Sequence, residues 1–518
     1  MNTWQANICL LAVTLCWSCE VVIHAVIPEG VSPFATTCVT SLIAALLLGG
    51  YFFRRIAIAI QEQRSLFIRR IVLLSILSTA YNVLFLVGLE HFDVSTGAFT
   101  ASMTVVVLPV LLLAMRRGTS IRTWVSASIV LAGIVVAVLP SIAGVHDVHG
   151  VGVMAAGCLI RAVFIVKLND YAREHDPVTL ATGMSAFAAL FSFIPWVCME
   201  PTTLFALPWN TELIAAYFIY AYFIVAFATV LNVYAQRRAS AAHATIIYSM
   251  EILFSSIWGV VLPDSIIDPV AVTPNLIAGC SLVVLGNLVE IMQKAPWREG
   301  KPSFDKVAAV MIQTSHPFAT LLNRLESRAI RAVLLFVGLL AVYLIIALPF
   351  KVLLVIPGFS DVRPVWMLMP VYGIFFGIPG CLASATGNLI CDILADSLRW
   401  SSIAGFVGNF AYPYLLYCIW TQWRKEHFHL RTPTRIAQVI VSFALCSAVT
   451  TAIITPAVAY YYPTVDAFAF AGTVAFNTFA FPVVLAIPFM ILIQEELGYK
   501  PISRHHDVET RIREAGLK

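Results

Sequence analysis

Charged residues are scarce in this sequence. They make up 12% of its 518 residues, and 60% of the residues are apolar. A soluble globular domain carries roughly 25% charged residues, so this composition cannot cover the surface of a soluble protein of this size. Apolar runs close to 20 residues long recur along the whole chain, as expected of membrane-spanning segments. The runs are continuous rather than alternating, which predicts helices.

Motifs for soluble chemistry are missing too. There is no P-loop and no nucleophile elbow, and Gly150-Val151-Gly152 lacks the strand and helix of a dinucleotide site. The net charge of +4 is small and scattered, which excludes nucleic acid as a partner. Cys16 and Cys19 are interpreted as packing residues, and His146-Asp147-Val148-His149 supplies too few ligands for a metal. We therefore predict no enzyme activity, no cofactor and no metal.

The apolar runs form two blocks. The first run is too long for a signal peptide and has no basic leader, so it is interpreted as a retained helix. The first block has ten predicted spans, at about 6–27, 33–53, 71–89, 97–115, 123–140, 151–166, 178–198, 212–235, 241–262 and 275–293. The second block has six, at about 332–356, 365–378, 381–397, 402–421, 438–461 and 468–493. The short pair 365–378 and 381–397 alternatively predicts a re-entrant hairpin.

Basic residues are confined to alternate loops of the first block. The odd-numbered loops (28–32, 90–96, 141–150, 199–211 and 263–274) contain no lysine or arginine. The even-numbered loops contain twelve: Arg54, Arg55, Arg64, Arg69, Arg70, Arg116, Arg117, Arg122, Lys167, Arg173, Arg237 and Arg238. Basic loops stay in the cytoplasm, so both ends of this block are predicted inside.

The same rule orients the second block, with weaker support. The basic linker 295–331, the loop around Arg424 and Arg435, and the charged tail 496–518 are predicted inside. Lys351, Arg363 and Arg399 fall on the predicted outer side. The expected location is the cell membrane, with N- and C-termini in the cytoplasm.

The first block repeats itself at an offset of about 144 residues. Pro33-Phe34-Ala35-Thr36 aligns with Pro177-Val178-Thr179-Leu180, and Ser95-Thr96-Gly97-Ala98 with Ser240-Ala241-Ala242-His243. Five helices per repeat is an odd number, so the halves insert with opposite topology, as in many secondary transporters. The predicted fold is an all-α polytopic membrane protein. It has a ten-helix inverted-repeat (5+5) transporter fold (1–140 and 141–294) and a second bundle of about six helices (332–495).

Residues 5–294 resemble the drug/metabolite transporter superfamily, in particular its EamA-type members. The stretches that carry the resemblance are Leu15-Cys16-Trp17-Ser18, 81–89 (YNVLFLVGL), Val94-Ser95-Thr96-Gly97-Ala98, Leu108-Pro109, Gly133, Ser249-Met250-Glu251, Gly279 and Gly286. The sequence departs from the family pattern at Cys19-Glu20, at Arg161 in place of a tryptophan, and at Ile252 in place of a proline. The resemblance implies a permease for small metabolites.

The second block resembles the six-helix substrate-binding subunit of energy-coupling-factor vitamin transporters. The residues that carry this resemblance are Val362-Arg363-Pro364, Gly373, Gly377, Gly380, Gly387-Asn388, Asp392, Gly405-Phe406, and Gly408-Asn409. The resemblance implies a membrane domain that binds a small molecule. Gly338 and Ala341 in the first helix are three residues apart rather than four, so the docking signature for an energy-coupling partner is not clear.

Ionisable residues inside spans are candidate site residues, because each costs roughly 2.5–3.5 kcal/mol to insert. In the first block these are Glu20, Arg161 and Glu251; Trp17 is the repeat equivalent of Arg161, and Asn82 lies in the third-helix stretch. One hypothesis is that they bind a charged substrate and carry a proton. The other is a buried ion pair that fixes helix packing. Glu290, His24 and His243 are interpreted as interfacial.

In the second block Asn388, Asp392 and Asp396 recur on one helical face, and Asn409 follows on the next span. They predict either the polar wall of a ligand pocket or interhelical hydrogen bonds in a glycine-packed hairpin.

These observations leave two functions open. The first is a secondary transporter of small metabolites such as amino acids, working by alternating access, with proton or ion coupling and a homodimer as open alternatives. The second is a membrane ligand-binding or sensing protein, or a vitamin-type uptake component acting through the second block. The bilayer and a small-molecule substrate are the expected partners. The resemblances point to a bacterial inner membrane.

Overall fold

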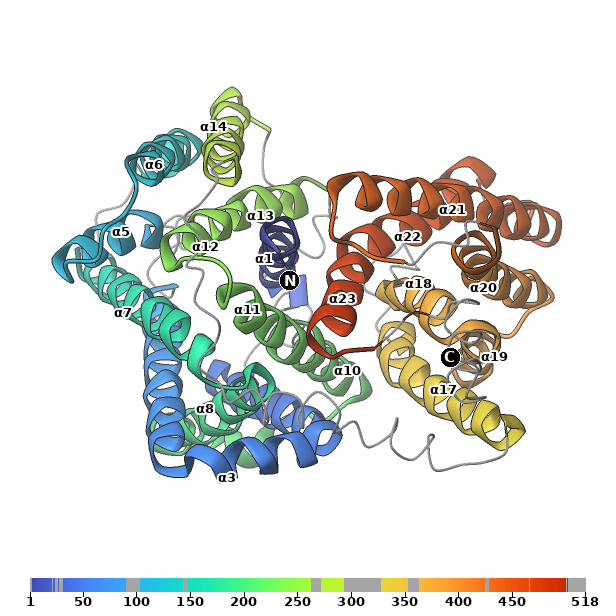
Figure 1. Ribbon diagram of the computed structural model, residues 1–518, viewed down its shortest axis with the longest axis horizontal. Helices are drawn as coiled ribbons and strands as arrows, with labels where there is room; N and C mark the ends of the chain where they lie inside the picture. Colours follow the sequence, from blue (N-terminus) through green and yellow to red (C-terminus); the bar gives the residue numbers. More distant parts are fainter. Residues whose placement is uncertain are drawn as a thin grey trace, which may run out of the picture. The chain divides into compact units, whose positions relative to one another are not determined.

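The computed structural model describes residues 2–20, 22–23, 27, 31–89, 103–142, 148–261, 272–292, 328–352, 363–423, 428–464, 466–499 and 501. Every regular element in these stretches is a helix (Figure 1). Eleven of the helical segments there are long and apolar enough to cross a membrane. The predicted all-α polytopic membrane fold is therefore confirmed. The chain divides into an N-terminal unit, residue 2 with residues 6–315, and a C-terminal unit, residues 316–518 with residues 3–5.

The ten predicted spans of the first block correspond to helical segments of the N-terminal unit. These are α1 (Thr3–Ser18), α3 (Pro33–Leu89), α5 (Thr104–Ala114), α6 (Ile121–Ile142), α7 (Val148–Glu174), α8 (Pro177–Met199), the short α9 (Thr203–Ala206), α10 (Thr211–Ile219), η1 (Tyr220–Phe227), α11 (Ala228–Gln236), α12 (Ala241–Tyr248), α13 (Met250–Val261) and α14 (Pro274–Ile291). The eighth span is the continuous run α10–η1–α11, in which η1 is a π-helix. The ninth is divided into α12 and α13 at Ser249.

Two predicted spans share the single helix α3. The sequence predicted a loop over residues 54–70, but helical hydrogen bonding continues through it. This stretch contains neither glycine nor proline, so nothing in its backbone chemistry ends the helix. Within the unit α3 packs against α7 and α8, and α6 lies beside α14 (Figure 1).

Side-chain caps set where several helices begin. Asp176 accepts a hydrogen bond from the Thr179 backbone at the start of α8, and Asn210, Ser240 and Thr273 do the same for α10, α12 and α14. Proline occupies the first turn of α8 and α14. These are the residue types that satisfy the free N–H groups of a first turn or need none.

The C-terminal unit contains α17 (Arg328–Val352), η2 (Pro364–Met367), α18 (Leu368–Val371), η3 (Tyr372–Phe376), α19 (Gly377–Leu394), α20 (Ser401–Tyr417), η4 (Cys418–Trp423), α21 (Pro433–Tyr461), α22 (Ala467–Phe481), η5 (Pro482–Ala486), α23 (Ile487–Ile491) and η6 (Leu492–Glu496). Neighbours in sequence pack together: α17 on α19, α19 on α20, α20 on α21, and α21 on α22.

The segment 364–394 counts as one candidate span by length and composition, but the chain reverses inside it. Gly377 has φ +59°, a conformation that favours glycine. A Cβ on Gly380 would lie 2.4 Å from the backbone oxygen of Tyr372, eight residues earlier. In a straight helix these residues would be roughly 12 Å apart. The limb from Pro364 to Phe376 is roughly 20 Å long, short of the ~30 Å hydrocarbon core, which favours the re-entrant hairpin.

This close approach makes Gly380 intolerant of a side chain. We expect Gly380→Ala to destabilise the C-terminal unit by about 1–3 kcal/mol, because the helix limbs of the hairpin must separate. Gly472→Ala in α22 is the matched control, since no atom lies within 4 Å of a Cβ there, and it should be neutral or slightly stabilising. Thermal unfolding of the purified protein in detergent measures both. Equal melting temperatures for the two variants would contradict the hairpin geometry.

Candidate functional site

Arg161 and Glu251, two of the predicted site residues, face each other in the N-terminal unit. Arg161 lies in the middle of α7 and Glu251 in the first turn of α13. The guanidinium nitrogen Nη2 lies 3.5 Å from the carboxylate Oε2, and the side chains are 14% and 29% exposed. The Arg161 guanidinium also lies over the Phe85 ring, 5.9 Å from its centroid. Among the described residues this is the one hydrogen bond of the Arg161 guanidinium, and it is long, so the arginine retains donor capacity there.

Glu20 belongs to the same polar region. It lies just beyond the end of α1 and accepts a hydrogen bond of 2.5 Å from the Tyr220 hydroxyl. Tyr220 is the first residue of the π-helix η1, and π-helical turns occur often at functional sites. Tyr81 of α3 lies within electrostatic reach of Glu20, Arg161 and Glu251. The three charges predicted for the site therefore share one neighbourhood.

Aromatic side chains line this neighbourhood. The Trp17 ring packs on Tyr248, with centroids 5.1 Å apart, and Tyr81 packs on Phe164 at 5.5 Å. Trp17 was among the site residues predicted from the sequence, whereas Tyr81, Tyr220 and Tyr248 were not. A signal for them existed, because a tyrosine hydroxyl in the middle of a span needs a polar partner.

The helix of the ninth span is interrupted just before Glu251. Helix α12 ends at Tyr248 and α13 begins at Met250, so Glu251 lies in the first turn of a new helix, where a carboxylate is favoured. The Ser249 hydroxyl donates to the Ile246 oxygen and accepts a 3.0 Å hydrogen bond from Asn287 of α14. This chain has Ile252 where related sequences were expected to have proline, and the hydrogen bonds of Ser249 maintain the break without it.

Two other pairs of ionisable side chains in the unit are more deeply buried. Arg55 donates to both oxygens of Asp176 at 2.6–3.2 Å and to the Tyr234 hydroxyl at 2.8 Å, with side chains 6% and 3% exposed. His243 lies 3.0 Å from Glu290, and both side chains are 3% exposed. His243 and Glu290, interpreted from the sequence as interfacial, are buried in the protein as a pair. His24 lies outside the described residues.

Asp176 and His175 form the turn between α7 and α8. Burial disfavours a charge on Asp176, but the Arg55 guanidinium beside it holds the pKa of that carboxyl below its ordinary value. Burial, and then the positive charge of Arg70, lowers the pKa of His175 to about 4. Arg70 Nη1 lies 2.8 Å from His175 Nε2. Because arginine can only donate, the imidazole accepts and is neutral.

The lowered pKa of His175 predicts that the folded protein loses stability in acid. The folded pKa of His175 is about 4 and the ordinary value is near 6.5, so between these pH values the unfolded chain binds more protons. Folding stability should therefore fall as the pH drops from about 6.5 to 4. His175→Gln should flatten this part of the profile, measured by thermal unfolding at a series of pH values. An unchanged slope in the variant would contradict the assignment.

The remaining predicted site residues lie elsewhere. Asn82 is half-buried on α3 beside Tyr81. In the C-terminal unit, Asp392 pairs with Lys351 and Asn388 with Arg363. Asn409 instead donates to Gly405 in its own helix. Asp396 does not share the face of Asn388, because it follows the end of α19 with φ +50° and is exposed.

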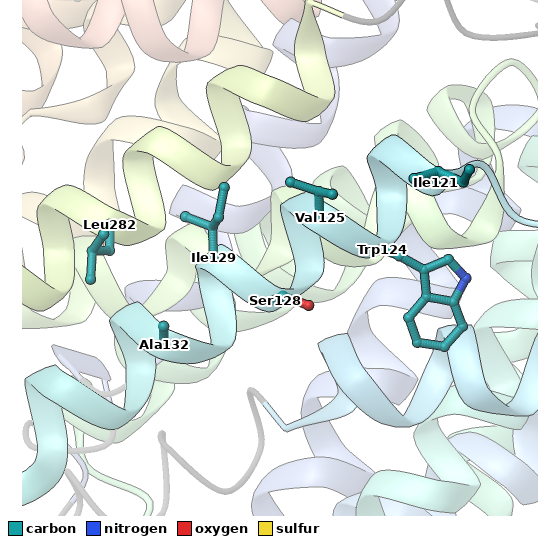
Figure 2. A pocket seen from close by; sticks show the side chains of 7 residues that line it. All are labelled: Ile121, Trp124, Val125, Ser128, Ile129, Ala132 and Leu282. Carbon is teal, nitrogen blue, oxygen red and sulfur yellow. The ribbon is translucent and has the colours of Figure 1, made fainter.

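A surface groove of about 430 Å³ does not belong to the site. Figure 2 shows six of its residues along α6 and Leu282 on the neighbouring α14. Ser128 is the only polar residue among the seven, and Ile121 is 82% exposed. None of the predicted site residues lines this groove. An apolar exposed face of this kind suits contact with lipid.

The comparisons with known proteins bear on the same unit. A model of the EamA-like transporter family matches residues 4–139 and 149–288, together 276 of the 518 residues. No curated protein matches the sequence. A solved structure titled only "Crystal structure of protein" is 19% identical, with a TM-score of 0.44, over 56% of this chain and 96% of its own. Residues 316–518, which make up nearly all of the C-terminal unit, lie outside the family match.

Proposed function

Because the chain belongs to the EamA-like transporter family, we propose that its N-terminal unit is a secondary transporter that binds its substrate at Arg161, Glu20 and Glu251. Family membership makes the protein a membrane transporter of small metabolites. The site and the mechanism are our proposal. The observation that carries it is the cluster of three charges and several aromatic rings described above.

Both family segments contribute to the cluster. Trp17, Glu20 and Tyr81 come from residues 4–139, whereas Arg161 and Glu251 come from residues 149–288. A site between two repeats changes its access when the repeats move against each other. This arrangement supports alternating access as the mechanism.

The loose pairing of Arg161 with Glu251 supports a role for this arginine in substrate binding. Arg55 has a bidentate carboxylate partner and a hydroxyl partner and is sealed from solvent. Arg161 has one 3.5 Å contact to a glutamate that is 29% exposed. A purely structural pair would be expected to be as closed as that of Arg55, since an incompletely paired buried charge is costly. A loosely held guanidinium suits exchange between a glutamate and an anionic group of a substrate.

The charges also suggest the class of substrate. Arg161 offers a fork that matches a carboxylate, and Glu20 and Glu251 offer acceptors for an amino group or a proton. Amino acids and related polar metabolites combine such groups. A glutamate that holds a proton in one state and a substrate amine in the other would couple export of the substrate to proton entry.

Orientation follows from the basic loops, and site-directed labelling tests it. A cysteine in place of exposed Trp209 should react with a membrane-impermeant maleimide from outside, and one in place of half-buried Arg117 should not. The exposed Cys198 is first replaced, so that the maleimide does not label this native cysteine. Labelling of position 117 in intact cells would contradict the proposed cytoplasmic termini.

Transport itself is tested in proteoliposomes. An imposed pH gradient should drive accumulation of at least one member of a radiolabelled amino-acid mixture, and a protonophore should abolish it. A protein that only senses a ligand would bind without net flux. Binding without flux across the whole mixture would favour that second function.

A further inference from the structure

The apolar groove along α6 has a shape that is fixed by the packing of two helices. Its lining residues run from Ile121 to Ala132 on α6, with Leu282 of α14 beside them (Figure 2). The helices approach closely, because a Cβ on Gly133 of α6 would lie 2.7 Å from the Gly279 backbone oxygen of α14. The two backbones therefore hold the groove in place, and no side chain has to move to open it.

The length of the groove matches one leaflet of a bilayer. Helix α6 begins at Ile121, next to the basic turn that follows α5, and the distance from Ile121 to Ala132 along the helix axis is roughly 17 Å. The hydrocarbon core is about 30 Å thick, so one leaflet contributes about 15 Å. Trp124 lies at the Ile121 end of α6 (Figure 2), and tryptophan is enriched where a helix meets the membrane interface. The groove thus extends from the interface to about the middle of the membrane, which is the depth of one acyl chain.

Positive charge gathers at the interfacial end of the groove. Three arginines lie in the α5–α6 turn or in the first turn of α6: Arg116, Arg117 and Arg122. Arg117 donates to both oxygens of Asp170 at 2.9 Å. Arg116 and Arg122 are exposed, and within the described part of the chain neither of them pairs with an acidic side chain. Two positive charges are therefore available to a partner at this end of the groove.

The start of α6 adds to the positive potential. Ser120 caps the helix by accepting a 3.1 Å hydrogen bond from the Thr123 N–H, and the other N–H groups of the first turn carry partial positive charge. Arg122 lies in this turn, which contains no acidic residue. The carboxylate of Glu290 accepts a hydrogen bond from the Thr123 hydroxyl but is buried with His243. The surface at this helix end therefore favours an anion.

We propose that the groove binds one anionic phospholipid, with an acyl chain along α6 and the phosphate at Arg116 and Arg122. Arginine binds phosphate through parallel N–H donors, and basic pockets between transmembrane helices recognise anionic headgroups. The chain covers apolar side chains that the protein leaves exposed, such as Ile121 and Val125. The lipid belongs to the leaflet on the side of the basic loops. The site shares no residue with the Arg161 cluster and does not depend on the function proposed above.

Native mass spectrometry of the full-length protein tests this proposal, because it counts bound lipids and copies of the chain together. Phosphatidylglycerol should give a one-lipid complex at concentrations at which phosphatidylcholine with the same acyl chains gives none. Arg116→Gln with Arg122→Gln should weaken phosphatidylglycerol binding about tenfold or more, because charge-assisted contacts to the phosphate are lost. The control is Arg54→Gln with Arg238→Gln, at exposed arginines of other basic segments, and it should bind as the wild type does.

A second variant tests the apolar part of the site without changing its charge. Ala132→Phe fills the groove and should also weaken binding, whereas Ala444→Phe, the same change at an exposed position of α21, should not. Glycerol 3-phosphate, a headgroup without acyl chains, should not displace the lipid. Displacement by this headgroup, equal binding of phosphatidylcholine, or equal effects of the site and control variants would overturn the proposal. A lipid-free dimer that Ala132→Phe converts to monomers would also overturn it, because a second copy of the chain would then occupy the groove.

Discussion

Arg161→Lys should lower transport at least tenfold while expression and melting temperature are maintained. Lysine keeps the charge near Glu251 but has no planar fork, so it cannot bind a carboxylate of the substrate through two parallel hydrogen bonds. Loss of one such charge-assisted contact corresponds to about 1.5–3 kcal/mol. Initial rates of pH-driven uptake in proteoliposomes measure the effect.

The matched control is Lys167→Arg on the same helix, which changes one basic residue into the other near the end of α7. It should leave the rate unchanged. Full activity of Arg161→Lys would mean that only the charge at this position matters, and the proposed carboxylate contact would then be wrong.

Arg55→Ala should be the most destabilising substitution in the N-terminal unit that we propose. It strands the Asp176 carboxylate, which is buried together with Arg55, and it removes a partner of Tyr234. Breaking a buried pair on one side costs about 3–5 kcal/mol. We expect a large drop in melting temperature and in the yield of folded protein. Arg54→Ala, at the exposed neighbouring arginine, should have little effect.

A double replacement distinguishes the contribution of the ion pair to stability from that of the helix cap. Arg55→Met with Asp176→Asn removes both charges, and the asparagine oxygen still caps α8 at Thr179. Most of the lost stability should return, because no charge is left without a partner. If the double variant is as unstable as Arg55→Ala, the pair does not account for the stability of this turn.

Hydropathy and loop charge were sufficient to predict the helical class and the approximate spans, because the cost of exposing backbone to lipid leaves few alternatives. Depth along a span left Glu20 and Glu251 as the possible partners of Arg161, since a mid-membrane charge requires a partner at similar depth, and the structure pairs Arg161 with Glu251. Rotation about the helix axis is what the sequence did not determine. The contact of Tyr220 with Glu20 and the burial of His243 with Glu290 depend on that rotation.

Backbone irregularities were predicted unevenly. The glycines around Gly377 indicated a reversal, because positive φ and close helix approach both require them. The break at Ser249 had no such signal. It depends on a hydrogen bond from Asn287 in another helix, and a tertiary contact of that kind cannot be read from local propensity. For the same reason the partners of Asn388 and Asp392 emerged only from the packing of α17 and the hairpin.

The most direct test of the central proposal is the double variant Arg161→Ala with Glu251→Ala, reconstituted in proteoliposomes. Both charges of the pair are absent, so no carboxylate is stranded and the fold should survive, as its melting temperature will verify. We predict that the folded double variant is inactive in pH-driven transport, because the substrate has lost its anion site and the cluster has lost a proton carrier. Transport at the wild-type rate would show that Arg161 and Glu251 only support the packing of the helices.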